Sequence, residues 1–228
     1  MDYHGMGNIG GSVFWVSLWL GVVLLAAELV ARFSPLGSEV SRKIVHIGVG
    51  NVILLAWWLQ VPAWVSLSAA VIASIVTLIS YWVPLLRSVS EVGRKSWGTF
   101  FYAVSIGALI AYFWPMGMPH YAVLGVLVMT WGDGLAAIIG QRFGRHPYQV
   151  WGMNKSWEGT ATMAIASLIV SGTVLGAVYG LSWAIALTAV LVAIIATGLE
   201  AFSKLGLDNL TVPLGSAFVA FALVQSLL

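Results

Sequence analysis

The residues best able to do chemistry gather in one stretch of the chain, from Trp131 to Thr160. That stretch reads WGDGLAAIIGQRFGRHPYQVWGMNKSWEGT, and its Asp133 lies inside an apolar run. An ionised carboxylate within a membrane is costly, so it is by default a functional group. The alternative is an Asp that is paired with a neighbouring Arg or capped by backbone groups. We take Asp133 as a candidate catalytic and metal-binding residue, because Gly132 and Gly134 would let a ligand or a helix approach it closely.

A second group of polar residues precedes the next apolar run, with Lys155, Ser156, Glu158 and Gly159 close together. Ser156 is placed to cap a helix, whose free N–H groups and positive dipole end would attract an anion. Lys155 would add a point charge to such a site. The alternative is that Lys155 has no role in binding and, as a single Lys at the end of a span, only extends its charged group toward the membrane surface. Glu158 could bind a metal ion.

Basic residues mark two further predicted helix starts. Arg42 and Lys43 come one turn before His46, so these side chains share a face of the helix. Arg94 and Lys95 precede another apolar run in the same way. Cations at a helix N-terminus oppose the macrodipole, which makes this repeated pattern unusual.

Three basic helix starts on one face could surround a polyanion such as a nucleoside triphosphate. Asp133 and Glu158 would then hold Mg²⁺, and His46 could act as a base or contact a phosphate. A buried histidine with a purely structural role is the competing interpretation of His46. The positive-inside rule alone also places cations near these ends, so the pattern supports the nucleotide interpretation without requiring it.

The remaining candidates lie near the last apolar run and within the central stretch. Glu200, Asp208 and Asn209 could contact a metal ion or a lipid hydroxyl, or one of the last two could merely cap a helix. A GxxxG pair, taken alone, indicates helix packing more than chemistry. The full set of candidates for nucleotide binding is Arg42, Lys43, Arg94, Lys95, Gly132, Gly140, Arg142, Gly144, Ser156 and Gly159.

The elements that must position these residues are membrane spans. Of the 228 residues, 60% are hydrophobic and 8% are charged, whereas soluble domains carry roughly 25% charge. We predict an all-α, polytopic membrane bundle with no β-sheet and a single catalytic domain over residues 1–228. About eight spans are expected, with seven possible, at 12–33, 44–60, 63–86, 99–114, 119–140, 159–180, 182–199 and 211–228.

The distribution of charge predicts the orientation of the bundle. All 10 Lys and Arg fall in, or at the edge of, the first, third, fifth and seventh connections between these runs. Eight spans would place them all on one side, which the positive-inside rule makes cytoplasmic, with both termini outside. Apart from Asp2, the acids lie on or near the same side. Because acids contribute little to orientation, the gathering of both signs predicts an active site at the cytoplasmic face.

Other features of the composition exclude several classes of protein. The net charge of +2 is too small to indicate a nucleic-acid partner. The absence of Cys excludes a thiolate nucleophile and a cysteine metal site. The motif GxxxxGK[ST] is also absent, which excludes a P-loop enzyme.

Four motifs in combination resemble the phytol kinase branch of the polyprenol kinase family. They are RKxxH at 42–46, GDGLAAIIGQRFGR at 132–145, NKSWEGT at 154–160 and GLDNLTVPL at 206–214. The resemblance covers about residues 39–214, and the family also includes dolichol kinase and the CTP-dependent diacylglycerol kinases. It implies a multi-span enzyme that phosphorylates a lipid alcohol, such as phytol or geranylgeraniol, using CTP or sometimes UTP, with Mg²⁺. It further implies nucleotide and metal binding by Arg42, Lys43, Asp133 and Lys155, with Glu158 nearby.

Two other functions remain as alternatives. The Gly-Asp and Lys-Ser-x-Glu-Gly elements are also similar to CDP-diacylglycerol synthases, which are cytidylyltransferases. Those enzymes usually carry a C-terminal Lys-Arg…Lys-Asp motif, which this chain lacks after Lys204. A transporter of an anionic metabolite would be expected to place polar groups near the midplane, whereas here they stay near one face. The predicted catalytic residues of the kinase are Asp133, Lys155, Glu158 and His46.

Overall fold

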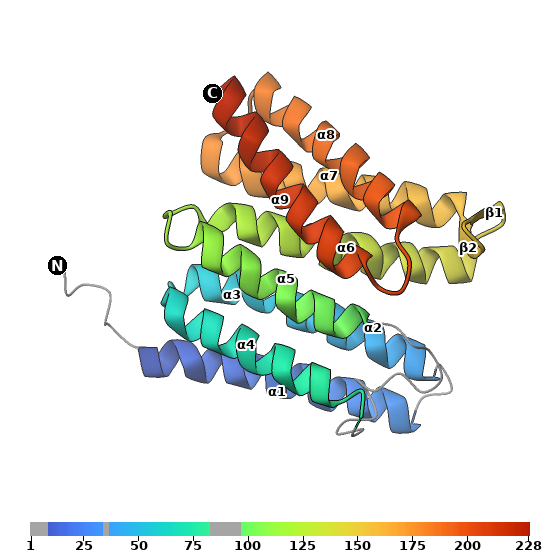
Figure 1. Cartoon of the computed structure of the whole chain (residues 1–228), viewed down its shortest axis with the longest axis horizontal. Coiled ribbons are helices and arrows are strands. Elements are labelled where there is room, and N and C mark those ends of the chain that lie inside the picture. Colours follow the sequence, from blue (N-terminus) through green and yellow to red (C-terminus); the bar gives the residue numbers. More distant parts are fainter. Residues whose placement is uncertain (1–8, 34–36, 83–96) are drawn as a thin grey trace.

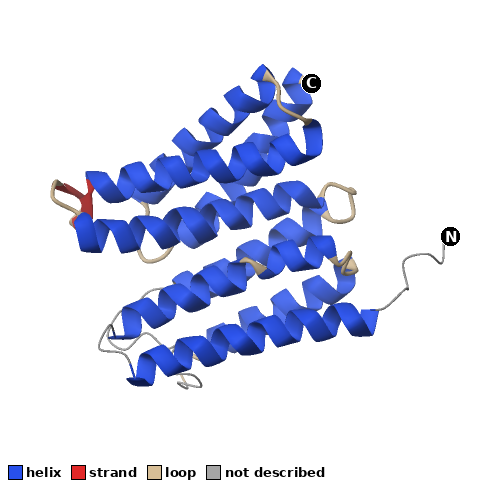
Figure 2. Cartoon of the chain, turned by 180° about the vertical axis from the view of Figure 1, so that it is seen from behind, coloured by secondary structure: helices blue, strands red, loops and turns tan. Residues whose placement is uncertain are grey.

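The computed structural model describes residues 9–33, 37–82 and 97–228, and these are almost entirely helical (Figure 2). The helices lie side by side in a bundle (Figure 1). Each predicted apolar run corresponds to a helix, with the second run divided between α2 and α3 at Asn51. The helices are α1 (Ile9–Phe33), α2 (Gly37–Gly50), α3 (Val52–Trp58), α4 (Ala63–Ile79), α5 (Gly98–Phe113), α6 (Pro119–Phe143), α7 (Trp157–Tyr179), α8 (Trp183–Phe202) and α9 (Asp208–Leu227).

Five of these helices, namely α1, α6, α7, α8 and α9, are long and apolar enough to cross a membrane. A span needs about 20 predominantly apolar residues, which each of the five provides. The chain is therefore a membrane protein. The apolar helices α4 and α5, and the α2–α3 pair, are shorter, so the expected number of eight crossings stays a prediction.

Helix α6 is the centre of the bundle, because it contacts α2, α3, α5, α7, α8 and α9. Every residue from His120 to Thr130 is buried. A helix that is apolar on all sides is buried either in protein or in lipid, and this stretch of α6 is buried in protein. Asp133 follows this stretch by three residues, so its backbone belongs to the most enclosed element of the protein.

The expectation of no β-sheet is wrong at one place, because a short hairpin joins α6 to α7. Its antiparallel strands are β1 (Pro147–Val150) and β2 (Met153–Ser156). Trp151 and Gly152 in the turn have φ angles of 48° and 77°, and a two-residue type I′ turn requires positive φ at both positions. Strands this short give too little alternation of apolar and polar residues to be recognised from the sequence.

The hairpin leads directly into α7. Ser156 is the last residue of β2 and has extended backbone angles, and its Oγ accepts a hydrogen bond from the Gly159 N–H at 3.2 Å. The prediction that Ser156 caps this helix is therefore confirmed. Lys155 consequently lies in a strand, not in the helix itself.

One end of the bundle collects the start of α2, the end of α6, the hairpin, the start of α7, the end of α8 and the start of α9 (right-hand side of Figure 1). We call it the polar end and define it by Lys43, Asp133, Lys155, Glu200 and Asp208. Helix α1 begins and α9 finishes at the opposite end. The antiparallel arrangement therefore brings together residues that are far apart in the chain.

Candidate active site at the polar end

The Asp133 carboxylate lies where α6 meets α2. Lys43 Nζ donates a hydrogen bond to its Oδ2 at 2.7 Å, and His46 Nε2 lies 3.6 Å from the same oxygen. The side chains of Lys43, His46 and Asp133 are only 10%, 13% and 18% exposed. The acid is thus paired with a cation from another helix, 90 residues away in the chain, and not with a neighbouring Arg.

His46 is held in place by residues of α5 and α6. Its ring stacks on that of Tyr102, with centroids 4.6 Å apart and planes 25° apart, and its Nε2 lies 3.4 Å from the Met129 carbonyl oxygen. The Tyr102 hydroxyl is hydrogen-bonded to Thr130 Oγ1 at 2.5 Å, and Thr130 in turn donates to the Val126 carbonyl oxygen at 2.6 Å. Tyr102 therefore connects the imidazole to the buried core of α6.

The sequence analysis did not identify Tyr102 or Thr130. Thr130 precedes Asp133 by three residues, so the two share a helical face, and this spacing was an available signal. Tyr102 lies in a predominantly apolar run 28 residues before Thr130, where no local pattern distinguishes it. Only the packing of α5 against α6 brings the two hydroxyls together.

Gly50 allows this packing because α2 comes very close to the Tyr102–Thr130 pair. A Cβ at Gly50 would lie 2.0 Å from Thr130 Oγ1 and 2.3 Å from the Tyr102 hydroxyl. Neither atom has room to retreat, since both are buried and hydrogen-bonded to each other. Any side chain at this position would displace the group that holds His46.

A second ion pair joins the hairpin to the end of α8. Lys155 Nζ forms an ion pair with the Glu200 carboxylate and donates to the Glu200 carbonyl oxygen at 2.6 Å. The two side chains are 17% and 12% exposed. The Lys is therefore anchored to α8 and is not merely a flank residue that extends away from the bundle.

Asp208 at the start of α9 connects the two ion pairs. Its carboxylate interacts electrostatically with Asp133, Glu200 and Lys155. Its Oδ1 also accepts hydrogen bonds from the Asn209 N–H at 3.0 Å and from Asn209 Nδ2 at 3.2 Å. The described residues of the polar end thus bring three carboxylates together with two Lys, and they leave Asp208 without an ion-pair partner among them.

This set of side chains fits Mg²⁺ by its chemistry. Carboxylate oxygens are the ligands that this ion prefers, and it is usually held by one or two carboxylates together with substrate phosphates. The part of the chain that the structure describes contains no cluster of three or more His, Asp or Glu arranged to hold a metal by themselves. The residues therefore suit an ion that arrives with a phosphate ligand more than an ion in an all-protein cage.

Glu158 does not join this cluster. Its Oε1 lies 2.7 Å from Nδ1 of His146, which is 75% exposed, and its Oε2 accepts a hydrogen bond from the His146 N–H at 3.4 Å. Asp133 precedes the last residue of α6, Phe143, by ten residues, which corresponds to about 15 Å of helix. The structure therefore pairs Glu158 with the region just beyond α6 and not with Asp133.

The predicted glycines lie where α6 meets α7. A Cβ at Gly132 would meet Met163 Sδ at 2.4 Å, one at Gly140 would meet Ser156 Oγ at 3.0 Å, and one at Gly144 would meet Ser156 Cβ at 2.9 Å. Gly159 faces α6 in return, because its Cβ would lie 3.0 Å from the Ala136 carbonyl oxygen. All four positions permit close contact between the two helices.

The other predicted nucleotide contacts lie away from the charged cluster or outside the residues that the structure describes. Arg142 is exposed, with its guanidinium 5.7 Å from the centroid of the Phe143 ring. Arg94 and Lys95 fall outside the described residues, as does the side chain of Arg42. Helix α2 begins at Gly37, so Lys43 lies well inside the helix, and the prediction that it marks the helix start is wrong.

The fold and the largely buried charged cluster at one end of it define an integral membrane protein with a charged site. No family model and no solved structure matches the chain. It is 53% identical to the phytol kinase of Synechocystis sp. over 204 residues, which cover 90% of this chain and 88% of that protein. It is 29% identical to a probable chloroplastic phytol kinase of Triticum aestivum over 242 residues, covering 94% of this chain and 77% of the relative. A chloroplastic farnesol kinase of Arabidopsis thaliana is 32% identical over 152 residues, covering 59% of this chain and 47% of that protein.

The chain therefore belongs to the phytol kinase family. It is an enzyme of the kinase class, as its motifs had indicated. The likeness to the cyanobacterial relative extends over most of both chains.

Proposed function

We propose that this chain phosphorylates phytol, or a related prenol such as geranylgeraniol, with CTP as donor, at the cytoplasmic face of the membrane. The observation that carries the proposal is the cluster of Lys43, Asp133, Lys155, Glu200 and Asp208, which lie largely buried at one end of the bundle. The names of the relatives, phytol kinase and farnesol kinase, support a prenol as acceptor. The choice of CTP, with UTP as the other candidate, rests on the resemblance of the motifs to the polyprenol kinases.

Phosphoryl transfer depends mainly on positioning and on neutralising charge at the transferred group. Lys43 and Lys155 supply the positive charges, and each is already oriented by a carboxylate. Asp133 and Asp208 are the carboxylates best placed to hold Mg²⁺, which would neutralise negative charge on the phosphates. Glu158, the other ligand predicted from the sequence, would have to leave His146 to take part.

The acceptor hydroxyl must lose its proton when its oxygen bonds to the terminal phosphorus of CTP, and the products are CDP and the prenyl monophosphate. His46 is the first candidate for receiving that proton, because its imidazole is held beside Asp133 at 3.6 Å by stacking on Tyr102. Asp208 is the second candidate. The prenyl chain would remain in the membrane, between apolar helices.

The charge distribution and the helix arrangement together support the cytoplasmic assignment. Lys43 and Lys155 belong to the polar end, and the exposed Arg142 lies in the last turn of α6, which ends on the same side of the bundle. By the positive-inside rule this end faces the cytoplasm, which would put both termini outside in an eight-span chain. A cysteine-labelling scan of single-Cys variants tests this orientation without background, because the natural sequence contains no Cys.

The test of the reaction is an assay of the purified protein with labelled CTP, UTP or ATP. Each donor is combined with phytol, farnesol, dolichol or diacylglycerol, with Mg²⁺ present. We expect CDP and phytyl monophosphate as the main products, and loss of this activity in Lys155→Ala. Formation of pyrophosphate and a CDP-lipid, without CDP, would contradict the kinase proposal and support a cytidylyltransferase.

A further inference from the structure

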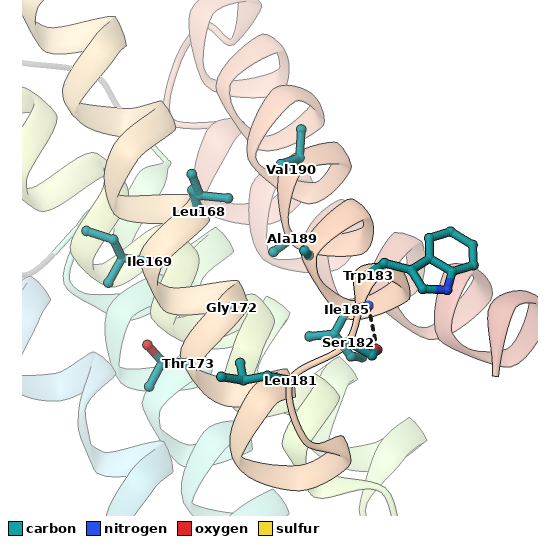
Figure 3. Close-up of a pocket in the computed structure, with 11 residues that line it drawn as sticks. Leu168, Ile169, Gly172, Thr173, Leu181, Ser182, Trp183, Ile185, Ala189 and Val190 are labelled. Atoms are coloured by element: carbon teal, nitrogen blue, oxygen red, sulfur yellow. Dashed lines mark hydrogen bonds between the residues drawn. The ribbon is translucent and has the colours of Figure 1, made fainter.

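An apolar groove of about 780 Å³ opens between α7 and α8, close to the loop that joins them (Figure 3). This loop lies at the opposite end of the bundle from the polar end (Figure 1). The α7 wall consists of Leu168, Ile169, Gly172 and Thr173, and the α8 wall includes Ile185, Ala186, Ala189 and Val190.

The α8 wall of the groove continues along one helical face to the candidate active site. Ala186, Val190, Ile194, Thr197 and Glu200 recur every three or four residues, which is the spacing of side chains on one side of a helix, and Ile194 is 62% exposed. Glu200 is the ion-pair partner of Lys155. A molecule lying along this face would therefore have one end at that ion pair and the other end in the groove.

The α7 wall leads in the same direction. Gly172, Leu168, Ile165, Ala161 and Glu158 follow the same three- and four-residue spacing back to the first turn of the helix. Ile165 is 59% exposed and Ala161 is exposed, so this face is open to lipid and not covered by another helix. Beyond the groove, the exposed apolar side chains of the two helices therefore form a track that leads toward the polar end.

The length of this track matches one kind of occupant. Val190 and Ala186 lie about 15 Å and 21 Å along α8 from Glu200. Phytol has a sixteen-carbon main chain, which extends about 19 Å with bonds of about 1.5 Å and near-tetrahedral angles. With its hydroxyl beside Glu200, its last carbons would reach the groove. The twelve-carbon main chain of farnesol extends only about 14 Å and would end before the groove.

We propose that the groove between α7 and α8 binds the distal end of the prenyl chain and makes the enzyme selective for twenty-carbon prenols. The small side chains in its walls leave room for methyl branches: a Cβ at Gly172 would touch only the Ala189 Cβ, at 3.9 Å. This inference rests on the proposed function, since it assumes that the hydroxyl reacts at the polar end.

Gly172→Leu tests the groove because the larger side chain would fill it. We expect the KM for phytol to rise about tenfold, which is the loss of binding expected for roughly two buried methylene groups. The KM for farnesol should stay within about twofold of the wild-type value, because farnesol ends before the groove. Gly21→Leu in α1 is the matched control, because a Cβ there meets no atom within 4 Å. An equal rise of KM for both alcohols in Gly172→Leu would overturn the proposal.

A second measurement does not depend on the variant being folded or on catalysis. Phytol carrying a photoreactive diazirine at its terminal carbon is bound to the wild-type protein and irradiated, and the labelled peptides are identified. Label within 168–173 and 181–190 supports the groove. Label spread over the lipid-facing helices would show ordinary lipid contact and would overturn the proposal. A wild-type protein that phosphorylates no prenol would instead contradict the proposed function, whatever the position of the label.

Discussion

At the polar end, Lys43 and Asp133 form one ion pair, and Lys155 and Glu200 form another. At the opposite end, where α6 begins and α7 finishes, the Tyr179 hydroxyl is hydrogen-bonded at 2.8 Å both to His120 Nε2 and to the Tyr121 hydroxyl. Both sets of side chains connect elements that are distant in the chain. The first set consists of charged groups, whereas the second consists of hydroxyl and imidazole groups within an aromatic cluster that includes Phe113 and Phe221.

The difference shows what each end of the bundle contributes. Neutral polar groups that satisfy one another hold membrane helices together at little cost. Charged groups are expensive in the same surroundings and mark functional sites. The His120–Tyr121–Tyr179 network can therefore be explained by packing alone, whereas the charged cluster needs a ligand or a reaction to explain it. Variants at the two ends should accordingly affect different properties of the protein.

Asp133→Asn should produce the largest effect on activity. The amide keeps the shape of the side chain but removes the charge that pairs with Lys43 and that would bind Mg²⁺, so we expect kcat to fall by at least about 100-fold. Phosphorylation of phytol by the purified variant measures this loss. The double variant Lys43→Met/Asp133→Asn removes both charges, and it should recover stability without recovering activity. Activity close to wild type in Asp133→Asn would remove Asp133 from the site.

Tyr102→Phe and Tyr102→Leu should have intermediate effects, because Tyr102 positions His46. Phe keeps the stacking but loses the hydrogen bond to Thr130, so kcat should fall about threefold to tenfold with little change in KM. Leu also removes the stacking and should lower kcat further. Steady-state kinetics of both variants, which give kcat and KM, measure these effects. If Tyr102 served only to stabilise the fold, thermal stability would fall while kcat remained unchanged.

Glu158→Gln sharpens the comparison within the polar end itself. The structure gives this carboxylate an exposed partner, His146, so we expect activity to fall less than about threefold, as for other exposed pairs. The same phosphorylation assay, run over a range of Mg²⁺ concentrations, detects any change in metal dependence. A loss as large as that of Asp133→Asn, reversed by high Mg²⁺, would place Glu158 among the metal ligands.

Tyr179→Phe should have the smallest effect on activity and a clear effect on stability. Removing the hydroxyl leaves the His120 and Tyr121 polar groups without their shared partner, which should cost about 1–3 kcal/mol of unfolding free energy. Thermal unfolding in detergent measures the stability, and the kinase assay should give wild-type rates. Reduced kcat with unchanged stability would show that the two ends are functionally coupled, and it would contradict the view that the His120–Tyr121–Tyr179 network serves packing alone.

The sequence predicted the helices well because apolar runs long enough to cross a membrane are a strong and local signal. It also indicated that the charges gather at one end, and it proposed Lys43, Asp133, Lys155, Glu200 and Asp208 as separate candidates. It did not predict which of them meet. The pairing of Lys43 with Asp133 depends on how α2 packs against α6, and no periodicity within either helix encodes a contact across 90 residues.

Other differences between sequence and structure have physical causes of the same kind. Glu158 and Asp133 looked equivalent because both are acids near glycines, but the structure pairs Glu158 with His146, and its role as a metal ligand stays a prediction. The hairpin before α7 was missed because its strands have four residues each. Tyr102 was missed because an aromatic residue within an apolar run is indistinguishable from any other core residue until its neighbours are known.

The close contact of Gly50 with Tyr102 and Thr130 affects how mutational tolerance in this enzyme should be interpreted. In a pooled selection for activity, every substitution at Gly50 should be lost, just as at Asp133. If positions were ranked by their tolerance to substitution alone, Gly50, which has no side chain, would be grouped with the catalytic residues. A parallel selection for the amount of folded protein would separate them, because Gly50 variants should be depleted from it and the double variant Lys43→Met/Asp133→Asn should not.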